Sequence, residues 1–145
     1  MARIVVKGGK GLKGSVTVSG SKNSTLPIMA ACLLSTDECV LHNVPSLEDV
    51  RVMEEVLKKL GAKVKRENDS LIINPRSVDC CELPEALTRK MRASNLVMGA
   101  LLGRFRKAKV SYPGGCAIGS RPMDLHIKGF RLLGCEVNED RGYIE

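Results

Sequence analysis

The chain has 145 residues, a length that typically gives one domain. Hydrophobic residues make up 43% and charged residues 27%, as in soluble globular proteins, and no run of eighteen apolar residues is present to span a bilayer. The formal net charge of +7 favours anionic partners. With no Trp, two Phe and two Tyr, few aromatic side chains are available to stack on bases. Nucleic acid therefore becomes a minor hypothesis beside a phosphorylated small molecule, and we expect no membrane partner.

The six cysteines form no CxxC pair, and neither histidine lies at ligand spacing from a pair of cysteines. The sequence therefore predicts no metal site. The first twenty residues lack the apolar stretch and cleavage site of a secretory signal, and they lack the Arg/Ser-rich helix of a transit peptide. We expect reduced thiols and a cytoplasmic protein.

Two stretches of the chain occur twice. LGAKV at 60–64 matches LGCEV at 133–137, at an offset of 73 residues. IMAA at 28–31 matches VMGA at 97–100, at an offset of 69, and a Ser/Asn pair precedes the apolar run in both. Self-similarity of this kind indicates a repeated structural unit, and the second copy is longer by four residues.

The repeat divides the chain into a first copy at 21–78, a second copy at 79–145 and a leading segment at 1–20. In the leading segment, residues 4–6 and 15–18 alternate like the strands of a hairpin. Because this segment precedes the first copy, we predict that it packs in neither copy.

The first copy is predicted to have the order helix, strand, helix, strand, strand. Ser46, three residues before Asp49, is the predicted N-cap of the second helix, and Gly61 is its predicted end. The predicted elements are a buried helix at 21–34, a strand at 39–42, an amphipathic helix between Ser46 and Gly61, and strands at 62–65 and 70–74 that turn at 68–69.

The second copy is predicted to repeat this order, which makes the fold α/β (α+β) with repeated β/α units. Pro122 is placed in the first turn of its second helix, and Gly134 ends that helix. The predicted elements are a helix at 90–103, a strand at 109–112, a helix at 122–133, and strands at 135–138 and 143–145. Because the last residue falls within a predicted strand, we expect the chain to be a fragment of a longer protein.

The four additional residues of the second copy fall in the loop at 113–121. Three glycines there permit close approach of a ligand, and Cys116 supplies a soft nucleophile or acid. Lys22 and Arg92 stand at the starts of the first helices of the two copies. Together with Arg121 they form a predicted basic cleft for anionic groups.

Each of these residues also has a simpler interpretation. A lone cysteine in a glycine-rich loop is usually a small buried side chain in a tight turn. A single cation at a helix start is usually a solvated surface charge. The other basic residues, among them Arg104, Arg106, Lys107 and Lys109, are interpreted as a solvated face.

Several motifs resemble those of the bacterial UDP-N-acetylglucosamine 1-carboxyvinyltransferases, a family of enolpyruvyl transferases that begins peptidoglycan synthesis. The resemblance runs the whole length of the chain and covers about the first third of the family's sequence. The most specific motif is PGGCAIGSRPMDLH at 113–126, and the others are GSKN at 20–23 with Leu26 and Pro27, LGA at 60–62, and MRAS at 91–94.

The resemblance implies a two-domain protein of repeated units, the inside-out α/β barrel, with substrates bound between the domains. It implies that residues 1–20 belong with the other domain. It also implies that Lys22 and Asn23 contact phosphoenolpyruvate and that Cys116 is the proton donor, which fosfomycin alkylates in this family. The residues implied to hold UDP-N-acetylglucosamine are Arg92, Arg121, Pro122, Met123, Asp124 and Leu125, of which Met123 alone departs from the family's residue type.

The reaction implied is transfer of the enolpyruvyl group of phosphoenolpyruvate to the 3-hydroxyl of the nucleotide sugar with release of phosphate, and no cofactor is expected. The family's general base, an aspartate, has no counterpart in this chain, so we expect the chain alone to be inactive without the missing C-terminal part. Two alternatives stay open. One is an enzyme like 3-phosphoshikimate 1-carboxyvinyltransferase, which lacks the PGGC loop, and the other is a noncatalytic module that binds phosphorylated ligands.

Overall fold

The computed structural model describes residues 3–9, 11–88, 94–112 and 122–145. The first copy contains α1 (Lys22–Ala31), η1 (Cys32–Leu34), β1 (Cys39–Leu41), α2 (Glu48–Lys59), β2 (Lys63–Glu67) and β3 (Ser70–Asn74). The second contains β4 (Glu82–Leu83), α3 (Glu85–Thr88), α4 (Ser94–Phe105), β5 (Lys109–Ser111), α5 (Asp124–Leu132), β6 (Glu139–Asp140) and β7 (Tyr143–Ile144). The predicted order of helices and strands is confirmed in the first copy. The second copy keeps this order with β6 in place of the strand predicted at 135–138, and it adds β4 and α3, which the sequence did not predict.

The helix α2 forms because its apolar residues recur on one face. Val50, Met53, Val56 and Leu57 are all fully buried, and acidic residues stand in the first turn and lysines in the last. Gly61 ends the helix with φ of +103°, and a Cβ there would lie 2.6 Å from a backbone oxygen. The predicted helix end at this glycine is therefore confirmed.

The two sheets have the same strand order. The first sheet runs β1-β3-β2, with both pairs antiparallel. The second runs β4-β5-β7-β6, in which the corresponding strands β5, β7 and β6 keep the same order and the same antiparallel pairing. The short β4 adds to the outer edge of β5 in parallel. The topology therefore repeats as the sequence does.

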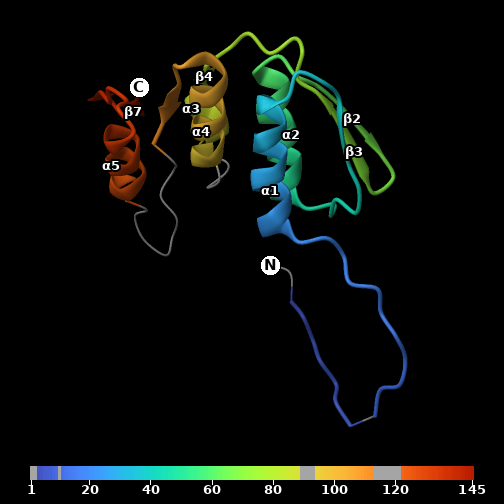
Figure 1. Cartoon of the computed structure of the whole chain (residues 1–145). Helices are drawn as coiled ribbons and strands as arrows, with labels where there is room; N and C mark the ends of the chain where they lie inside the picture. The colour runs from blue at the N-terminus through green and yellow to red at the C-terminus, as the bar shows by residue number, and fades with distance from the viewer. Residues whose placement is uncertain (1–2, 10, 89–93, 113–121) are drawn as a thin grey trace.

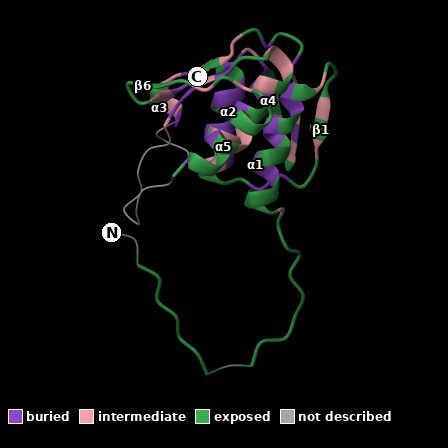
Figure 2. Cartoon of the chain, turned by 60° about the vertical axis from the view of Figure 1, so that its left-hand side comes forward, coloured by how far each residue is buried: buried purple, intermediate pink, exposed green. Residues whose placement is uncertain are grey.

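The helices α1, α2 and α4 lie together against the sheets, and the buried residues gather between them (Figures 1 and 2). Arg104 on α4 joins the two copies. Its guanidinium donates to the carbonyls of Leu33 at 2.8 Å, Ser35 at 3.0 Å and Pro75 at 3.0 Å. The interpretation of Arg104 as part of a solvated face was therefore wrong, because these carbonyls end η1 and β3 and need a donor.

Residues 3–9 and 11–19 are exposed and form no helix or strand, although 4–6 and 15–18 were predicted to alternate as strands. They form the long loop that leaves the rest of the molecule in Figures 1 and 2. That they belong with another domain stays a prediction.

None of the helices in the described part of the chain is both long and apolar enough to cross a membrane.

Three local predictions were wrong. Leu47, not Ser46, is the N-cap of α2, and the Ser46 hydroxyl instead accepts a hydrogen bond from Arg51 at 3.2 Å. Helix α5 begins at Asp124 with Met123 as its N-cap, so Pro122 precedes the helix. The predicted strand at 135–138 is absent, because pairing with the last strand begins only near Asn138 and continues in β6.

Candidate functional site

Four helices begin at the same end of the molecule. In Figure 1, α1, α2, α4 and α5 all start at the lower end and run upward. A helix carries a partial positive charge at its amino end, where backbone N–H groups lack partners within the helix. The first turns of α1 and α4 contain no acidic residue of their own, whereas those of α2 and α5 contain Glu48, Asp49 and Asp124. The starts of α1 and α4 are therefore the two places at this end that are suited to anions.

Gly20 fixes the place where α1 begins. Its backbone N–H donates to Oδ1 of Asn43 at 3.1 Å, and a Cβ at this position would lie 1.9 Å from the Asn43 carbonyl oxygen. Only glycine permits so close an approach. Ser21 then caps the helix, since its Oγ accepts the N–H of Ser24 at 3.4 Å and its carbonyl accepts the N–H of Thr25 at 2.9 Å. These contacts position the two residues predicted to contact phosphoenolpyruvate.

Lys22 is the first residue of α1, and its side chain reaches the first turn of α2. Its Nζ lies 2.7 Å from Oδ2 of Asp49, with 43% of the lysine side chain and 40% of the aspartate side chain exposed. Asn23 is exposed in the same turn of α1. This contact between Asp49 and Lys22 was not predicted from the sequence. The signal for Asp49 was its place at a predicted helix start, where it was used only as evidence for a cap.

A second polar contact joins the amino ends of α4 and α5. Nδ2 of Asn95 and Nε2 of His126 lie 3.4 Å apart. Asn95 is the second residue of α4, and His126 is the third of α5. In each copy, a side-chain contact therefore links the two longest helices at the end where they begin.

The predicted nucleotide-sugar ligands at 122–125 lie at the start of α5. Pro122, Asp124 and Leu125 are exposed, whereas Met123 is 4% exposed and packs in the core. The Met123 side chain therefore presents only a small part of its surface to solvent. A cavity of about 350 Å³ lies beside them, lined by Tyr112, Pro122, Met123, Asp124, Ile127, Lys128, Arg131 and Glu139.

Cys116, Arg92 and Arg121 lie outside the described residues, so their predicted roles stay predictions. Among the described thiols, Cys32 is buried. Burial, and next the neighbouring Cys39, raise the pKa of the Cys32 thiol to about 12, so it stays neutral at physiological pH. No group of three or more His, Cys, Asp or Glu side chains in the described ranges is arranged to hold a metal ion.

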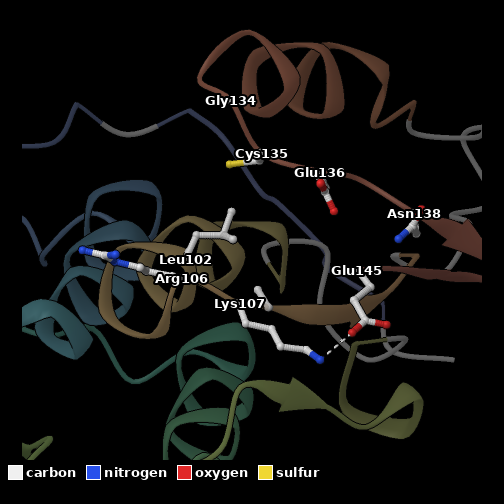
Figure 3. A pocket seen from close by; sticks show the side chains of 9 residues that line it. Leu102, Arg106, Lys107, Gly134, Cys135, Glu136, Asn138 and Glu145 are labelled. Carbon is white, nitrogen blue, oxygen red and sulfur yellow. Dashed lines mark ion pairs between the residues drawn. The ribbon is translucent and has the colours of Figure 1, made fainter.

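A further cavity of about 600 Å³ lies at the carboxyl ends of α4 and α5 (Figure 3). An ion pair of 2.8 Å between Lys107 and Glu145 stands at its edge. Its lining residues are Leu102, Arg106, Lys107, Ala108, Gly134, Cys135, Glu136, Asn138 and Glu145. Because it lies at the opposite ends of these helices from Asn95 and His126, it is separate from the candidate site.

Comparison with known proteins identifies the family. The family model described as EPSP synthase (3-phosphoshikimate 1-carboxyvinyltransferase) matches residues 6–145. UDP-N-acetylglucosamine 1-carboxyvinyltransferase 1 of Carboxydothermus hydrogenoformans is 51% identical over 99% of this chain and 34% of its own length. The corresponding protein 1 of Caldanaerobacter subterraneus subsp. tengcongensis is 52% identical over 99% of this chain and 34% of its length. UDP-N-acetylglucosamine 1-carboxyvinyltransferase 2 of Clostridium tetani is 48% identical over 100% of this chain and 35% of the relative's own length.

A solved structure has the same fold. The enolpyruvyl transferase NikO from Streptomyces tendae superposes with a TM-score of 0.78 at 22% sequence identity, covering 94% of this chain and 30% of that chain. The repeated β/α architecture expected from the sequence is therefore confirmed as that of an enolpyruvyl transferase. The chain spans about a third of the length of the curated relatives it matches.

Proposed function

The chain belongs to the EPSP synthase family, and from this premise we propose that it is part of a UDP-N-acetylglucosamine enolpyruvyl transferase. The observation that carries the proposal is its identity at about half of all positions, over nearly its whole length, with proteins that bear that name. The enzyme would act in the cytoplasm at the first committed step of peptidoglycan synthesis, as the bacterial family does.

The proposed reaction has an addition step and an elimination step. The 3-hydroxyl oxygen of the sugar bonds to C2 of phosphoenolpyruvate while a proton is delivered to the methylene carbon. In the second step the C2–O bond to phosphate breaks, the methyl carbon loses a proton, and inorganic phosphate leaves. Cys116 is the proposed acid for the first proton, since a thiol placed over the methylene carbon donates it directly.

The cations supply the electrostatic part of this chemistry. Lys22, at the amino end of α1, is proposed to contact the phosphate or carboxylate of phosphoenolpyruvate, and Asn23 is proposed to orient that substrate by hydrogen bonding. Arg92 and Arg121 are proposed to bind the nucleotide sugar together with the start of α5, where Asp124 and Leu125 are exposed. The base for the sugar hydroxyl would come from the part of the protein that follows these residues.

One other reaction has an observation in its favour. The matching family model is described by 3-phosphoshikimate 1-carboxyvinyltransferase, which transfers the same group to a different hydroxyl. The PGGC loop favours the nucleotide sugar, because the shikimate enzymes lack it. A noncatalytic module that binds phosphorylated ligands is the remaining alternative.

A chimera tests the proposal. Residues 1–145 would replace the matching third of the Caldanaerobacter subterraneus relative, which is 52% identical to them. We expect phosphate release from phosphoenolpyruvate with UDP-N-acetylglucosamine as acceptor and none with shikimate 3-phosphate. The unaltered relative is the control for the assay, and circular dichroism is the control for folding. Release only with shikimate 3-phosphate, or a folded chimera without turnover, would contradict the proposal.

A further inference from the structure

The ion pair between Lys22 and Asp49 connects the candidate site to a residue that has no role in the proposed chemistry. We propose that Asp49 is a positioning residue, which aims the Lys22 ammonium at the anionic substrate. This inference rests on the proposed function, and it adds a carboxylate from α2 to a site otherwise built from α1, α4 and α5. Asp49 itself touches no reacting atom in this proposal.

Lys22 needs such a partner because of where it stands. Its long side chain has four rotatable bonds, and it begins at the positive amino end of α1, which repels an ammonium. The first turn of α1 contains no acidic residue to offset that repulsion. Asp49 supplies the missing negative charge at 2.7 Å from Nζ. The contact thus gives a flexible cation one preferred direction.

The geometry leaves the ammonium free to bind a ligand. An ammonium has three N–H donors, and the hydrogen bond to Asp49 uses one of them. The lysine side chain is 43% exposed, so the remaining donors have access to an incoming phosphate or carboxylate. Asp49 therefore orients Lys22 without blocking it.

Asp49 is itself held in place more firmly than Lys22. Its side chain is short, and it stands in the first turn of α2, where the helix dipole favours a carboxylate. The next residue, Val50, is fully buried, as is Met53 one turn later, so the core fixes this end of α2. The core therefore sets the position of the Asp49 backbone, and its short carboxylate side chain gives the longer Lys22 side chain a defined partner.

The pair is poorly suited to a purely structural role. Both side chains are about two-fifths exposed, and exposed ion pairs add little to the stability of a fold. Replacing Asp49 should therefore change catalysis without changing thermal unfolding. This difference separates positioning from support of the fold.

The test uses the active chimera with Asp49→Asn, and with Glu48→Gln as the matched control. Glu48 is the neighbouring carboxylate in the same turn of α2, it is exposed, and no ion pair of it is found with the described residues. We expect Asp49→Asn to lower kcat/KM for phosphoenolpyruvate by about 10- to 100-fold, the loss typical of a misplaced substrate-binding group. Glu48→Gln should stay within about twofold of the parent, and both variants should keep the parent's melting temperature.

A double-mutant cycle with Lys22→Met then shows whether Asp49 acts through the lysine. If it does, Asp49→Asn should lower kcat/KM by less than about twofold once Lys22 is gone. Two results would overturn the inference and leave the proposed function standing. One is that Asp49→Asn lowers kcat/KM as much in the Lys22→Met background as in the parent, and the other is that Asp49→Asn alone lowers kcat/KM no more than Glu48→Gln does. A folded parent chimera without turnover would contradict the proposed function, and with it this inference.

Discussion

The two copies share one topology, but they bury equivalent residues very differently. Leu60 in the first copy and Leu133 in the second occupy the same position of the repeat, at the end of the second helix. Leu60 is 0% exposed, whereas Leu133 is 81% exposed. The same motif therefore closes the core in one copy and stays open in the other. Within these 145 residues, the two copies therefore keep the same path of the chain but differ in how their equivalent residues pack.

The second helix accounts for this difference. Helix α2 packs along α1, whereas α5 buries only Ile127 along its length, with Met123 buried just before it. The cavity of about 600 Å³ lies between the ends of α4 and α5, and two further leucines of the α5 helix, Leu125 and Leu132, are exposed. The copy with the inserted loop at 113–121 is thus the less tightly packed of the two.

Truncating the paired leucines tests this comparison most strongly. Leu60→Ala should lower the free energy of unfolding of the 145-residue chain by about 2–5 kcal/mol, because it leaves a cavity in a closed core. Leu133→Ala should change it by less than about 0.5 kcal/mol, because its side chain is already in solvent. Urea unfolding followed by circular dichroism measures both. Equal losses would mean that Leu133 is buried in solution.

A second pair of equivalent positions in the two copies carries ion pairs, and we expect their loss to change the free energy of unfolding less than the loss of Leu60 does. Arg66 in β2 and Glu139 in β6 are 73 residues apart, and each pairs with the second helix of its own copy. Glu54 accepts from Arg66 at 2.6 Å with 12% of its side chain exposed, whereas Arg131 lies 3.3 Å from the more exposed Glu139. The polarity of the pair is reversed between the copies, and only the first pair is shielded from water.

Glu54→Gln should therefore cost about 1–3 kcal/mol, less than the loss of a fully buried pair because Arg66 keeps some access to water. Glu139→Gln should cost less than about 1 kcal/mol. The same urea titration compares the two variants. A larger loss for Glu139→Gln would reverse the order of packing that we assign to the copies.

The smallest expected effect is on the pKa of Tyr112, whose hydroxyl donates a hydrogen bond to Glu139. This bond raises the pKa of Tyr112 above its ordinary value of about 10. Its stabilisation is fully present below the unfolded pKa and is lost as pH rises through the folded pKa. In a Tyr143→Phe variant, which leaves one tyrosine, phenolate absorbance should titrate above pH of about 10, and adding Glu139→Gln should lower the midpoint. A midpoint that does not respond to Glu139→Gln would contradict this contact.

The sequence predicted those parts of the fold that depend on local signals. The apolar spacing that ends at Gly61 and the turn at 68–69 need only neighbouring residues, and both are confirmed. The predicted N-cap at Ser46 was wrong, because a suitable residue type does not by itself make a cap. Leu47 has the extended backbone conformation of the cap, and the Ser46 hydroxyl accepts a hydrogen bond from Arg51 instead. Strand β4 and helix α3 were missed because elements of two and four residues carry no periodicity.

The candidate site was predictable only in its individual residues. Lys22 was found because it stands at a helix start in a motif that resembles a known family. Its contact with Asp49 was not, because the pairing of α1 with α2 is set by packing between helices rather than by spacing along the chain. Arg104 was misjudged for the same reason, since its carbonyl partners lie at least 29 residues away in the sequence.

Two substitutions in the active chimera test the proposed role of Cys116 as proton donor most directly. Cys116→Ala should lower turnover of phosphoenolpyruvate with UDP-N-acetylglucosamine by about 10²- to 10⁴-fold, because the proton donor is lost. Cys116→Asp should keep measurable turnover, since a carboxylic acid also donates a proton, and it should resist fosfomycin because it forms no thioether. Turnover of Cys116→Ala equal to that of the parent would contradict the assignment of Cys116 as the proton donor.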